Sequence, residues 1–169
     1  MEILEALRQK VARVQAGLTN GLFVRDMAIR HERDIMDLQQ YQLLQGKSSS
    51  GADLRPFYSE DLKPYGWFKS AETAGRYAAW KQEISYPYEV SRNPDAPNLY
   101  ITGKFHDELA VSFTMSSVEI VGATAYAKQI MAKYGTRNFG LMREKWNALF
   151  WDFGGYREVM NEVKKLLYE

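Results

Sequence analysis

The sequence predicts an α+β fold, in which a small antiparallel sheet with a central hairpin packs against several helices. Residues 111–121 contain the clearest run of alternating apolar and polar residues, the pattern of half-buried strands. Elsewhere apolar residues recur at spacings of three and four, as on the buried face of a helix. The length of 169 residues and apolar content of 46% fit a single domain, residues 1–169, with a sizeable core.

The composition narrows the class of protein. The chain has no cysteine, which excludes disulfides, thiolate catalysis and cysteine metal sites. A net charge of +1 gives no long-range attraction to DNA or membranes. The first residues lack a signal-peptide pattern and no apolar run reaches membrane-spanning length, so we expect no membrane association. The aromatic content of 14% fits either a rich core or an interface-forming protein.

The N-terminal part, residues 2–45, is predicted to be helical. A first helix covers residues 2–17, where Gly17 suits its end. A second helix is predicted from about residue 20 to 45, with a dense charged face on which Arg30 and Asp34 are spaced to form an ion pair. We interpret these charges as a solvated helix face rather than a phosphate or metal site. The first helix carries an apolar row made of Ile3, Leu4, Leu7, Val11 and Val14.

A glycine-bounded loop follows, from Gly46 to Gly51. Its Gly46-Lys47-Ser48 run is similar to part of a phosphate-binding loop. That motif requires a glycine five positions earlier, where this chain has Tyr41, and a strand before the loop. We therefore interpret residues 46–51 as a flexible loop that ends the preceding helix.

Residues 52–97 form an irregular insertion that contains all five prolines of the chain. A short helix is predicted over residues 70–81, with Ser70 as its N-cap and Thr73 in the first turn. Two interpretations of the insertion stay open. It either carries contacts to other molecules, as long loops often do, or it is a structural excursion over the core.

The hairpin–helix core is predicted over residues 98–141. A short strand or extended entry at 98–102 leads through Gly103 to a helical turn at 104–108. Strands at 111–116 and 117–121 pair as a hairpin with its tip at residues 116–117. A helix at 123–134 places Tyr126, Ile130 and Tyr134 on one face and ends at Gly135. Further helices are predicted at 142–151 and, as the C-terminal helix, at 155–168.

The side chains capable of chemistry do not form a recognisable site. His106, Asp107 and Glu108 are adjacent, so their side chains diverge on a turn and do not by themselves converge on one metal ion. No nucleophile accompanies them as a catalytic group would require. His31 has no second histidine at ligand spacing. We expect no catalytic residue, no metal site and no cofactor.

Two stretches of the chain, residues 34–51 and 98–142, carry short motifs with a known counterpart. They resemble a family of tailed-phage and prophage virion proteins of the minor tail component or virion-morphogenesis type, which includes neck, head–tail joining and tail-completion proteins. In that family a leucine, a threonine or serine and a glycine lead into a hairpin, followed by a tyrosine–alanine helix and a glycine. A Gln-x2-Leu-x2-Gly pattern ends an early helix, and residues 42–46 are similar to it. The residues that carry the resemblance are Gly46, Gly51, Thr102, Gly103, Tyr126, Ala127, Gly135, Phe139, Gly140 and Leu141.

The resemblance implies a non-enzymatic structural protein of the head–tail junction. Its copies would assemble in the host cytoplasm as a homo-oligomeric ring in the neck or tail-completion region of the virion. Its partners would be other neck, portal or tail proteins, and DNA would pass through the channel without sequence-specific binding. A cyclic ring repeats one head-to-tail interface, and we expect the hairpin edge and the 52–97 insertion to form it.

The alternative interpretation is a small nucleic-acid-binding or regulatory module. Such a module needs a basic face, and the early basic residues are interleaved with acids. A hydrolase is a third interpretation. The chain has only two histidines and no cysteine, so it offers few of the side chains that hydrolases use, which argues against this interpretation. The basic residues concerned are Arg8, Lys10, Arg13, Arg30 and Arg33.

Overall fold

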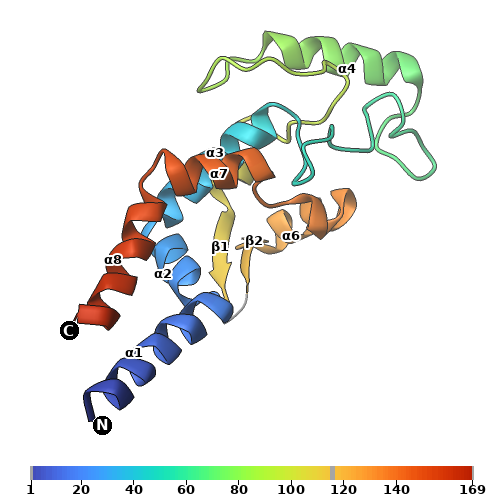
Figure 1. The fold of residues 1–169 in the computed structure, drawn as a ribbon. Helices are drawn as coiled ribbons and strands as arrows, with labels where there is room; N and C mark the ends of the chain where they lie inside the picture. The colour runs from blue at the N-terminus through green and yellow to red at the C-terminus, as the bar shows by residue number, and fades with distance from the viewer. Residues whose placement is uncertain (1, 115–116, 169) are drawn as a thin grey trace.

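The computed structural model describes residues 2–114 and 117–168. Within them, eight α-helices and one two-stranded antiparallel sheet confirm the predicted α+β class, with 56% of residues helical and 9% in strands. Figure 1 shows an elongated arrangement. Both chain ends lie at one end of the molecule, α4 (Ala71–Glu83) lies at the other, and the hairpin lies between them.

The N-terminal part contains three helices instead of the two predicted. They are α1 (Glu2–Thr19), α2 (Leu22–Arg30) and α3 (Glu32–Leu44). The predicted continuous helix 20–45 is wrong because the chain breaks at His31, where φ is −101° and ψ is 21°. The His31 ring lies between two acids, with Nδ1 2.7 Å from Asp34 and Nε2 3.3 Å from Glu158 of α8 (Gly155–Tyr168). A tertiary contact thus accompanies a break that no glycine or proline marks.

The break also changes the charge pairs of this region. Arg30 and Asp34 were expected to pair along one helix, and this prediction is wrong. Arg30 instead contacts Glu162 at 2.9 Å and Glu158 at 3.6 Å, both on α8. Asp34 pairs with His31. The Arg30 contacts join α2 to the C-terminal helix, so they stabilise tertiary structure rather than a single helix.

The insertion contains the helix that its sequence predicts. α4 begins after Ser70, whose hydroxyl accepts a hydrogen bond from Thr73 N at 3.3 Å, as an N-cap does. The rest of the insertion consists of turns and isolated bridges, one of which pairs Leu62 with Phe68. Leu54 is fully buried and belongs to the main core, so the insertion is anchored to the body near its start.

The hairpin is confirmed, with its first strand beginning two residues earlier than predicted and its second strand one residue later. β1 (Leu109–Phe113) pairs with β2 (Val118–Gly122), and Val111 lies opposite Ile120. The predicted residues 115–116 lie outside the described residues. The helical turn is α5 (Lys104–Asp107). Residues 98–102 do not form a strand. Leu99 has a φ of 55°, and Asn98 Oδ1 accepts a hydrogen bond from Tyr100 N, so the chain turns here instead.

The C-terminal third consists of α6 (Ala125–Tyr134), a 3₁₀ turn at Thr136–Asn138, α7 (Arg143–Trp151) and α8. α6 begins later than the predicted residue 123 because Thr124 is its N-cap, accepting from Ala127 N at 3.1 Å. α6 packs tightly on β2. A Cβ on Gly122 would lie only 2.7 Å from Lys128 N.

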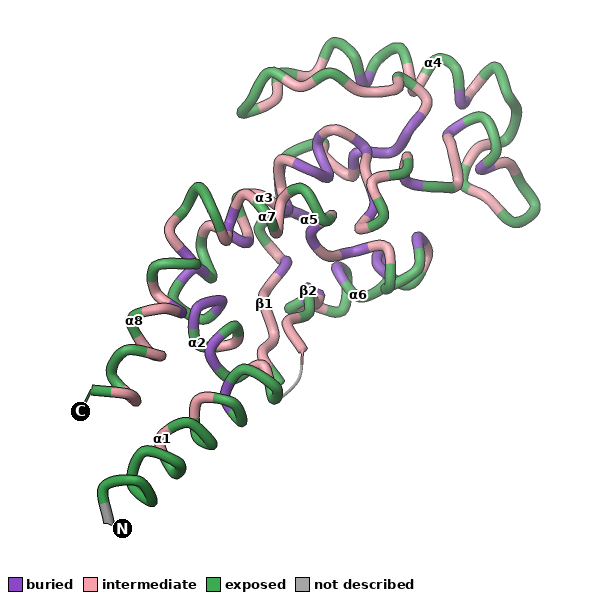
Figure 2. Tube along the Cα trace, viewed as in Figure 1, coloured by how far each residue is buried: buried purple, intermediate pink, exposed green. Residues whose placement is uncertain are grey.

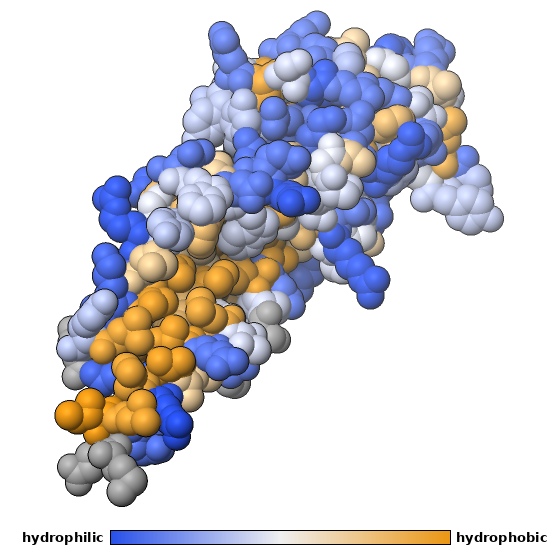
Figure 3. Space-filling view, viewed as in Figure 1, coloured by the Kyte–Doolittle hydropathy of each residue, from blue (hydrophilic) through white to orange (hydrophobic). Residues whose placement is uncertain are grey.

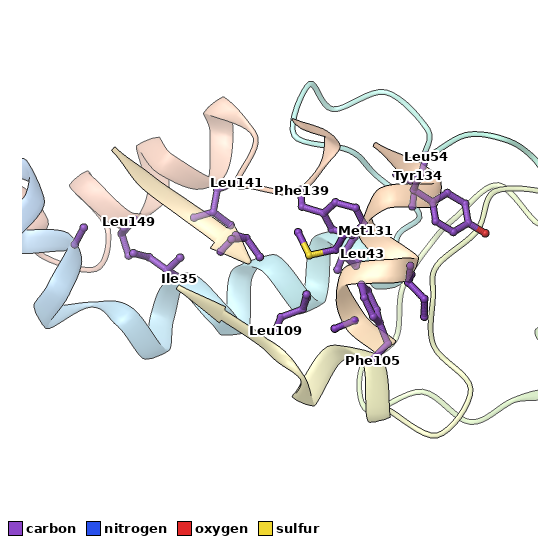
Figure 4. Close-up of a cluster of buried hydrophobic side chains, with 14 of the residues drawn as sticks. Ile35, Leu43, Leu54, Phe105, Leu109, Met131, Tyr134, Phe139, Leu141 and Leu149 are labelled. Atoms are coloured by element: carbon purple, nitrogen blue, oxygen red, sulfur yellow. The ribbon is translucent and has the colours of Figure 1, made fainter. Parts of the chain in front are cut away.

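The core runs along α3, the hairpin, α6 and α7 (Figure 4). In Figure 2 the buried segments follow this line, whereas α1 is mostly exposed. Ile35, Leu43 and Leu149 are among its fully buried side chains. Tyr126 was predicted to share one helix face with Ile130 and Tyr134. Those two side chains are buried, whereas Tyr126 is 46% exposed. The close approach of α6 to β2 turns the small Ala127 inward and leaves Tyr126 at the surface.

Candidate functional site

Helix α1 carries a row of large apolar side chains that are exposed. We call Ile3, Leu4, Leu7, Val11 and Leu18 the α1 stripe; each is at least half exposed, from 50% for Val11 to 87% for Ile3. Figure 3 shows hydrophobic side chains gathered over the end of the molecule that α1 occupies. The sequence predicts the spacing of this row but not its exposure. Contiguous apolar patches of this kind mark interaction surfaces.

Residues that adjoin this row on the surface of the helix attach α1 to α2 and α8. Lys10 Nζ donates to Leu167 O at 3.3 Å, and Val14 is half-buried. Gly17 lies against Phe23, whose ring carbon Cζ would be 2.5 Å from a Cβ at that position. These contacts fix the position of the helix and leave the α1 stripe exposed beside them.

A second exposed apolar group lies where α7 meets α8. We call Trp151, Phe153 and Tyr156 the α7–α8 corner; they are 63%, 47% and 45% exposed. The Trp151 and Tyr156 rings have centroids 5.1 Å apart, and Trp151 meets Phe150 edge-on at 4.9 Å. In Figure 1 this corner lies at the opposite end of α8 from the N-terminus of α1. The molecule therefore exposes two separate apolar surfaces.

The outer edge of β2 offers main-chain groups to a further strand. Ala123 N donates to Glu108 O at 2.8 Å, so these two residues are a hydrogen-bonded pair of the hairpin. The register then alternates between hydrogen-bonded and non-hydrogen-bonded pairs along the two strands. By the alternation of antiparallel pairing, Val118 and Ile120 direct their backbone groups away from β1. A groove runs beside this edge, with Met131 of α6 on its far wall. The hairpin edge that we expected to make contacts is thus accessible.

The two motif stretches meet at a pair of buried glutamines on α3. Gln42 Nε2 donates to Gly140 O at 2.8 Å, and its Oε1 accepts from Met142 N at 2.9 Å. Gln39 Oε1 accepts from Gly140 N at 3.1 Å. Ser49 N, from the 46–51 loop, donates to Asn138 O at 2.9 Å. Long-range bonds therefore tie the loop and the end of α3 to the segment after α6.

These bonds give most motif residues a structural role. The left-handed φ values at Gly46, Gly51 and Gly135, 70°, 83° and 84°, permit the turns at this junction. Phe139 and Leu141 are buried in the core. The described loop contains no row of backbone donors around a phosphate-sized space; its amide groups bond within the protein, as Ser48 N does to Ala52 O.

The remaining motif residues lie around a pocket between the insertion and the core. Thr102 and Tyr126 line it, and Gly103, with a φ of 85°, turns the chain at its edge. Ala127 lies in the core instead. Lys81 of α4 also lines the pocket and is only 1% exposed. Its side chain is the most unusual feature of this region.

The adjacent acids and histidine before the hairpin do not converge, as expected. His106 is buried, its Nε2 lies 3.1 Å from Asn98 O, and burial lowers its pKa to about 4. Glu108 points elsewhere, accepting from the Thr124 hydroxyl at 2.6 Å. Across residues 2–114 and 117–168, no group of three or more histidine and acidic side chains is arranged to hold a metal ion.

The early basic residues do not form one free basic face. Arg30 is bound by Glu158 and Glu162 of α8, and Lys10 donates to a backbone carbonyl. Arg8 and Arg13 remain exposed on α1. This division gives no support to the nucleic-acid-binding interpretation.

Sequence reasoning missed Lys81, although a signal was present. Ala74, Tyr77 and Lys81 occur at spacings of three and four, so the lysine continues the inward face of an amphipathic helix. The exposure of the α1 stripe had no such signal, because the spacing alone describes a buried face equally well.

Comparison with known proteins returns no match to a protein-family model, a curated protein or a solved structure. In the part of the chain that the structure describes, no helix is both long enough and apolar enough to cross a membrane.

Proposed function

We propose that this chain is a non-enzymatic structural subunit of a tailed-phage virion, which assembles into a homo-oligomeric ring around the DNA channel at the head–tail junction. The α1 stripe is the observation that carries the proposal of self-assembly. The resemblance of residues 34–51 and 98–142 to virion-morphogenesis proteins supplies the class. The other partners would be neck, portal or tail proteins, and DNA would pass through the channel without sequence-specific binding.

The α1 stripe favours assembly for a thermodynamic reason. Covering a large aliphatic side chain contributes about 1.5–3 kcal/mol when it passes from full exposure to full burial. Ile3, Leu4 and Leu7 stand together at the start of α1, at 87%, 57% and 53% exposure. A neighbouring subunit that covers this row recovers much of that energy.

The second surface of the interface would be the α7–α8 corner of the next copy. A ring needs a head-to-tail contact between two different surfaces of each subunit. The α1 stripe is a ridge of aliphatic side chains, whereas the α7–α8 corner is a group of aromatic rings that contact one another. Tryptophan and tyrosine are enriched at the centres of protein interfaces. The two groups are separate, so one copy can engage a neighbour on each side.

A mixing experiment tests this arrangement. Leu7→Glu disables the α1 stripe and Trp151→Glu disables the α7–α8 corner. The wild-type chain should form a defined ring by light scattering and electron microscopy, and each variant alone should be monomeric. An equimolar mixture of the two variants should stop at a one-to-one dimer, because only one intact interface can form.

The matched control is Gln9→Glu, which adds the same charge to an exposed position of α1 outside the stripe. It should assemble like the wild type. A wild-type chain that stays monomeric at high concentration would contradict the proposal. If Leu7→Glu abolishes assembly but Trp151→Glu does not, the α1 stripe is part of the interface and the α7–α8 corner is not.

A further inference from the structure

We propose that the pocket around Lys81 binds a small, flat organic carboxylate, with the Lys81 ammonium as its ionic contact. This binding site is independent of the proposed assembly function. It rests on a buried cation without a partner, on aromatic walls and on the size of the cavity.

Lys81 is a buried cation for which the protein supplies no counter-charge. Its side chain is 1% exposed, and the described residues form no ion pair with its Nζ. The centroid of the Tyr86 ring lies 5.8 Å from Nζ. Lysine is almost never buried in this way unless paired, because an unpaired charge loses its hydration. A bound anion would replace the missing partner.

The charged groups around Lys81 repel a second cation and favour an anion. Arg92 is the neighbouring charge, and its guanidinium donates to Ala96 O at 3.1 Å and to Lys81 O at 3.4 Å. Burial, and then the charge of Arg92, lower the pKa of Lys81 to about 7. His106, which also faces this lysine, is neutral at pH 7 because burial lowers its pKa. The pocket lining in the described structure contains Lys81 and Lys104 but no acid.

The walls of the pocket are aromatic and suit a planar molecule. Tyr58 and Tyr77 meet edge-to-face with centroids 5.1 Å apart. Tyr100, Tyr126 and Trp67 complete much of the lining. Aromatic rings arranged in this way hold a flat ligand by stacking and edge contacts. Lys104 Nζ lies 5.2 Å from the Tyr126 ring centroid, and its largely exposed side chain places a second cation near the mouth.

The donors present in the pocket fit a monocarboxylate better than a phosphate. The cavity has a volume of about 80 Å³. That space accepts a carboxylate and part of one ring, with the remainder toward the mouth. A phosphate group is usually bound by several backbone N–H groups or a forked guanidinium. This lining instead offers lysine point charges, and only Lys81 among them is buried, which matches a monocarboxylate.

Titration of the full-length protein with benzoate tests the proposal, with benzamide as the uncharged analogue of the same shape. Benzoate should bind one-to-one at pH 7, and benzamide should bind weaker by about tenfold or more, as expected for loss of a charge-assisted contact. Lys81→Met should weaken benzoate binding by a similar factor. Lys69→Met, which removes an exposed lysine from the same insertion, should leave binding unchanged.

The pH dependence supplies a readout that does not depend on any variant. Because the carboxylate pairs with the protonated amine, benzoate affinity for the wild type should fall as pH rises above about 7. Equal binding of benzoate and benzamide, full binding by Lys81→Met, or no saturable binding by the wild type would each overturn the proposal. Lys81→Gln serves as a second variant if Lys81→Met does not fold. Ring assembly is measured separately, so failure of one proposal leaves the other standing.

Discussion

Helices α1 and α4 depart in opposite ways from the rule that apolar side chains are buried and charged side chains are exposed. α1 keeps large apolar side chains outside, with Ile3 87% exposed, whereas α4 keeps a lysine inside, with Lys81 1% exposed. α1 is attached to α2 and α8 through residues such as Lys10, and the apolar row beside these contacts stays exposed. α4 lies over a pocket whose described lining contains no acid.

The difference between the two helices indicates that each would be stabilised by a different kind of binding partner. An exposed apolar ridge is stabilised by another large surface, so α1 points to a macromolecule. A buried cation is stabilised by one compensating charge, so α4 points to a small anion. We accordingly propose an assembly surface at one end of the molecule and a ligand pocket at the other.

The largest expected effect comes from comparing a buried and an exposed leucine. Leu43 of α3 is fully buried and Leu4 of α1 is 57% exposed. Leu43→Ala should lower the free energy of unfolding by about 3 kcal/mol, because it removes packed methyl groups and leaves a cavity. Leu4→Ala should change the free energy of unfolding of the monomer by less than about 0.5 kcal/mol. Urea denaturation in the Leu7→Glu background measures both without assembly.

A large loss of stability in Leu4→Ala would show that α1 packs its stripe against its own chain in solution. In that case α1 would not be an assembly surface, and the contrast between α1 and α4 would disappear.

Lys81→Met should give the next largest effect, and it should stabilise the protein. The pKa of Lys81 is lowered to about 7, chiefly by burial, so the folded state disfavours its charged form. Replacing an unpaired buried charge with an apolar side chain of similar length should raise the free energy of unfolding at pH 7 by about 2 kcal/mol. Lys69→Met, at an exposed position, should change it little.

The sign of the pH dependence follows from the lowered pKa. Between about pH 7 and 10.5, the ordinary pKa of a lysine, the unfolded chain binds the lysine proton more tightly than the folded protein. Wild-type stability should therefore rise with pH across that range, and the advantage of Lys81→Met should shrink. Urea denaturation at pH 7 and pH 9 checks this. A destabilised Lys81→Met at pH 7 would mean that the amine has an intramolecular partner.

Local patterns in the sequence predicted much of the fold. The alternation around Val111 and Ile120 located the hairpin, and Ser70 located the start of α4, because strand pleating and helix capping are local effects. The break at His31 and the absence of a strand at 98–102 could not be predicted in the same way. They accompany a contact with Glu158 and a turn made by the Asn98 side chain.

The candidate sites were harder to predict than the fold. A helical spacing shows that one side of α1 is apolar, but only the positions of α2 and α8 show which part of that side is covered. The same limit applies to Lys81, whose burial depends on residues far along the chain, such as Tyr100 and Tyr126. The motif glycines were visible in sequence, yet the long-range bonds from Gln39 and Gln42 give them their structural setting.

The smallest expected effect is a glycine-to-alanine substitution that changes the free energy of unfolding in opposite directions in α1 and α4. Both helices contain a glycine, Gly17 in α1 and Gly75 in α4. A Cβ at Gly17 would lie 2.5 Å from the Phe23 ring, whereas nothing lies within 4 Å of a Cβ at Gly75. Gly17→Ala should lower the free energy of unfolding by about 1 kcal/mol, because overpacking outweighs the gain in helix propensity. Gly75→Ala should raise it by about 0.5–1 kcal/mol.

Thermal and urea denaturation of the two alanine variants, again in the Leu7→Glu background, provides the comparison. Opposite signs would show that the junction of α1 with α2 is closely packed in solution and that α4 is open on its outer side. Stabilisation by both substitutions would mean that the Phe23 ring moves aside freely. α1 would then be loosely attached, and its stripe could not be presented to a neighbouring subunit in a fixed orientation.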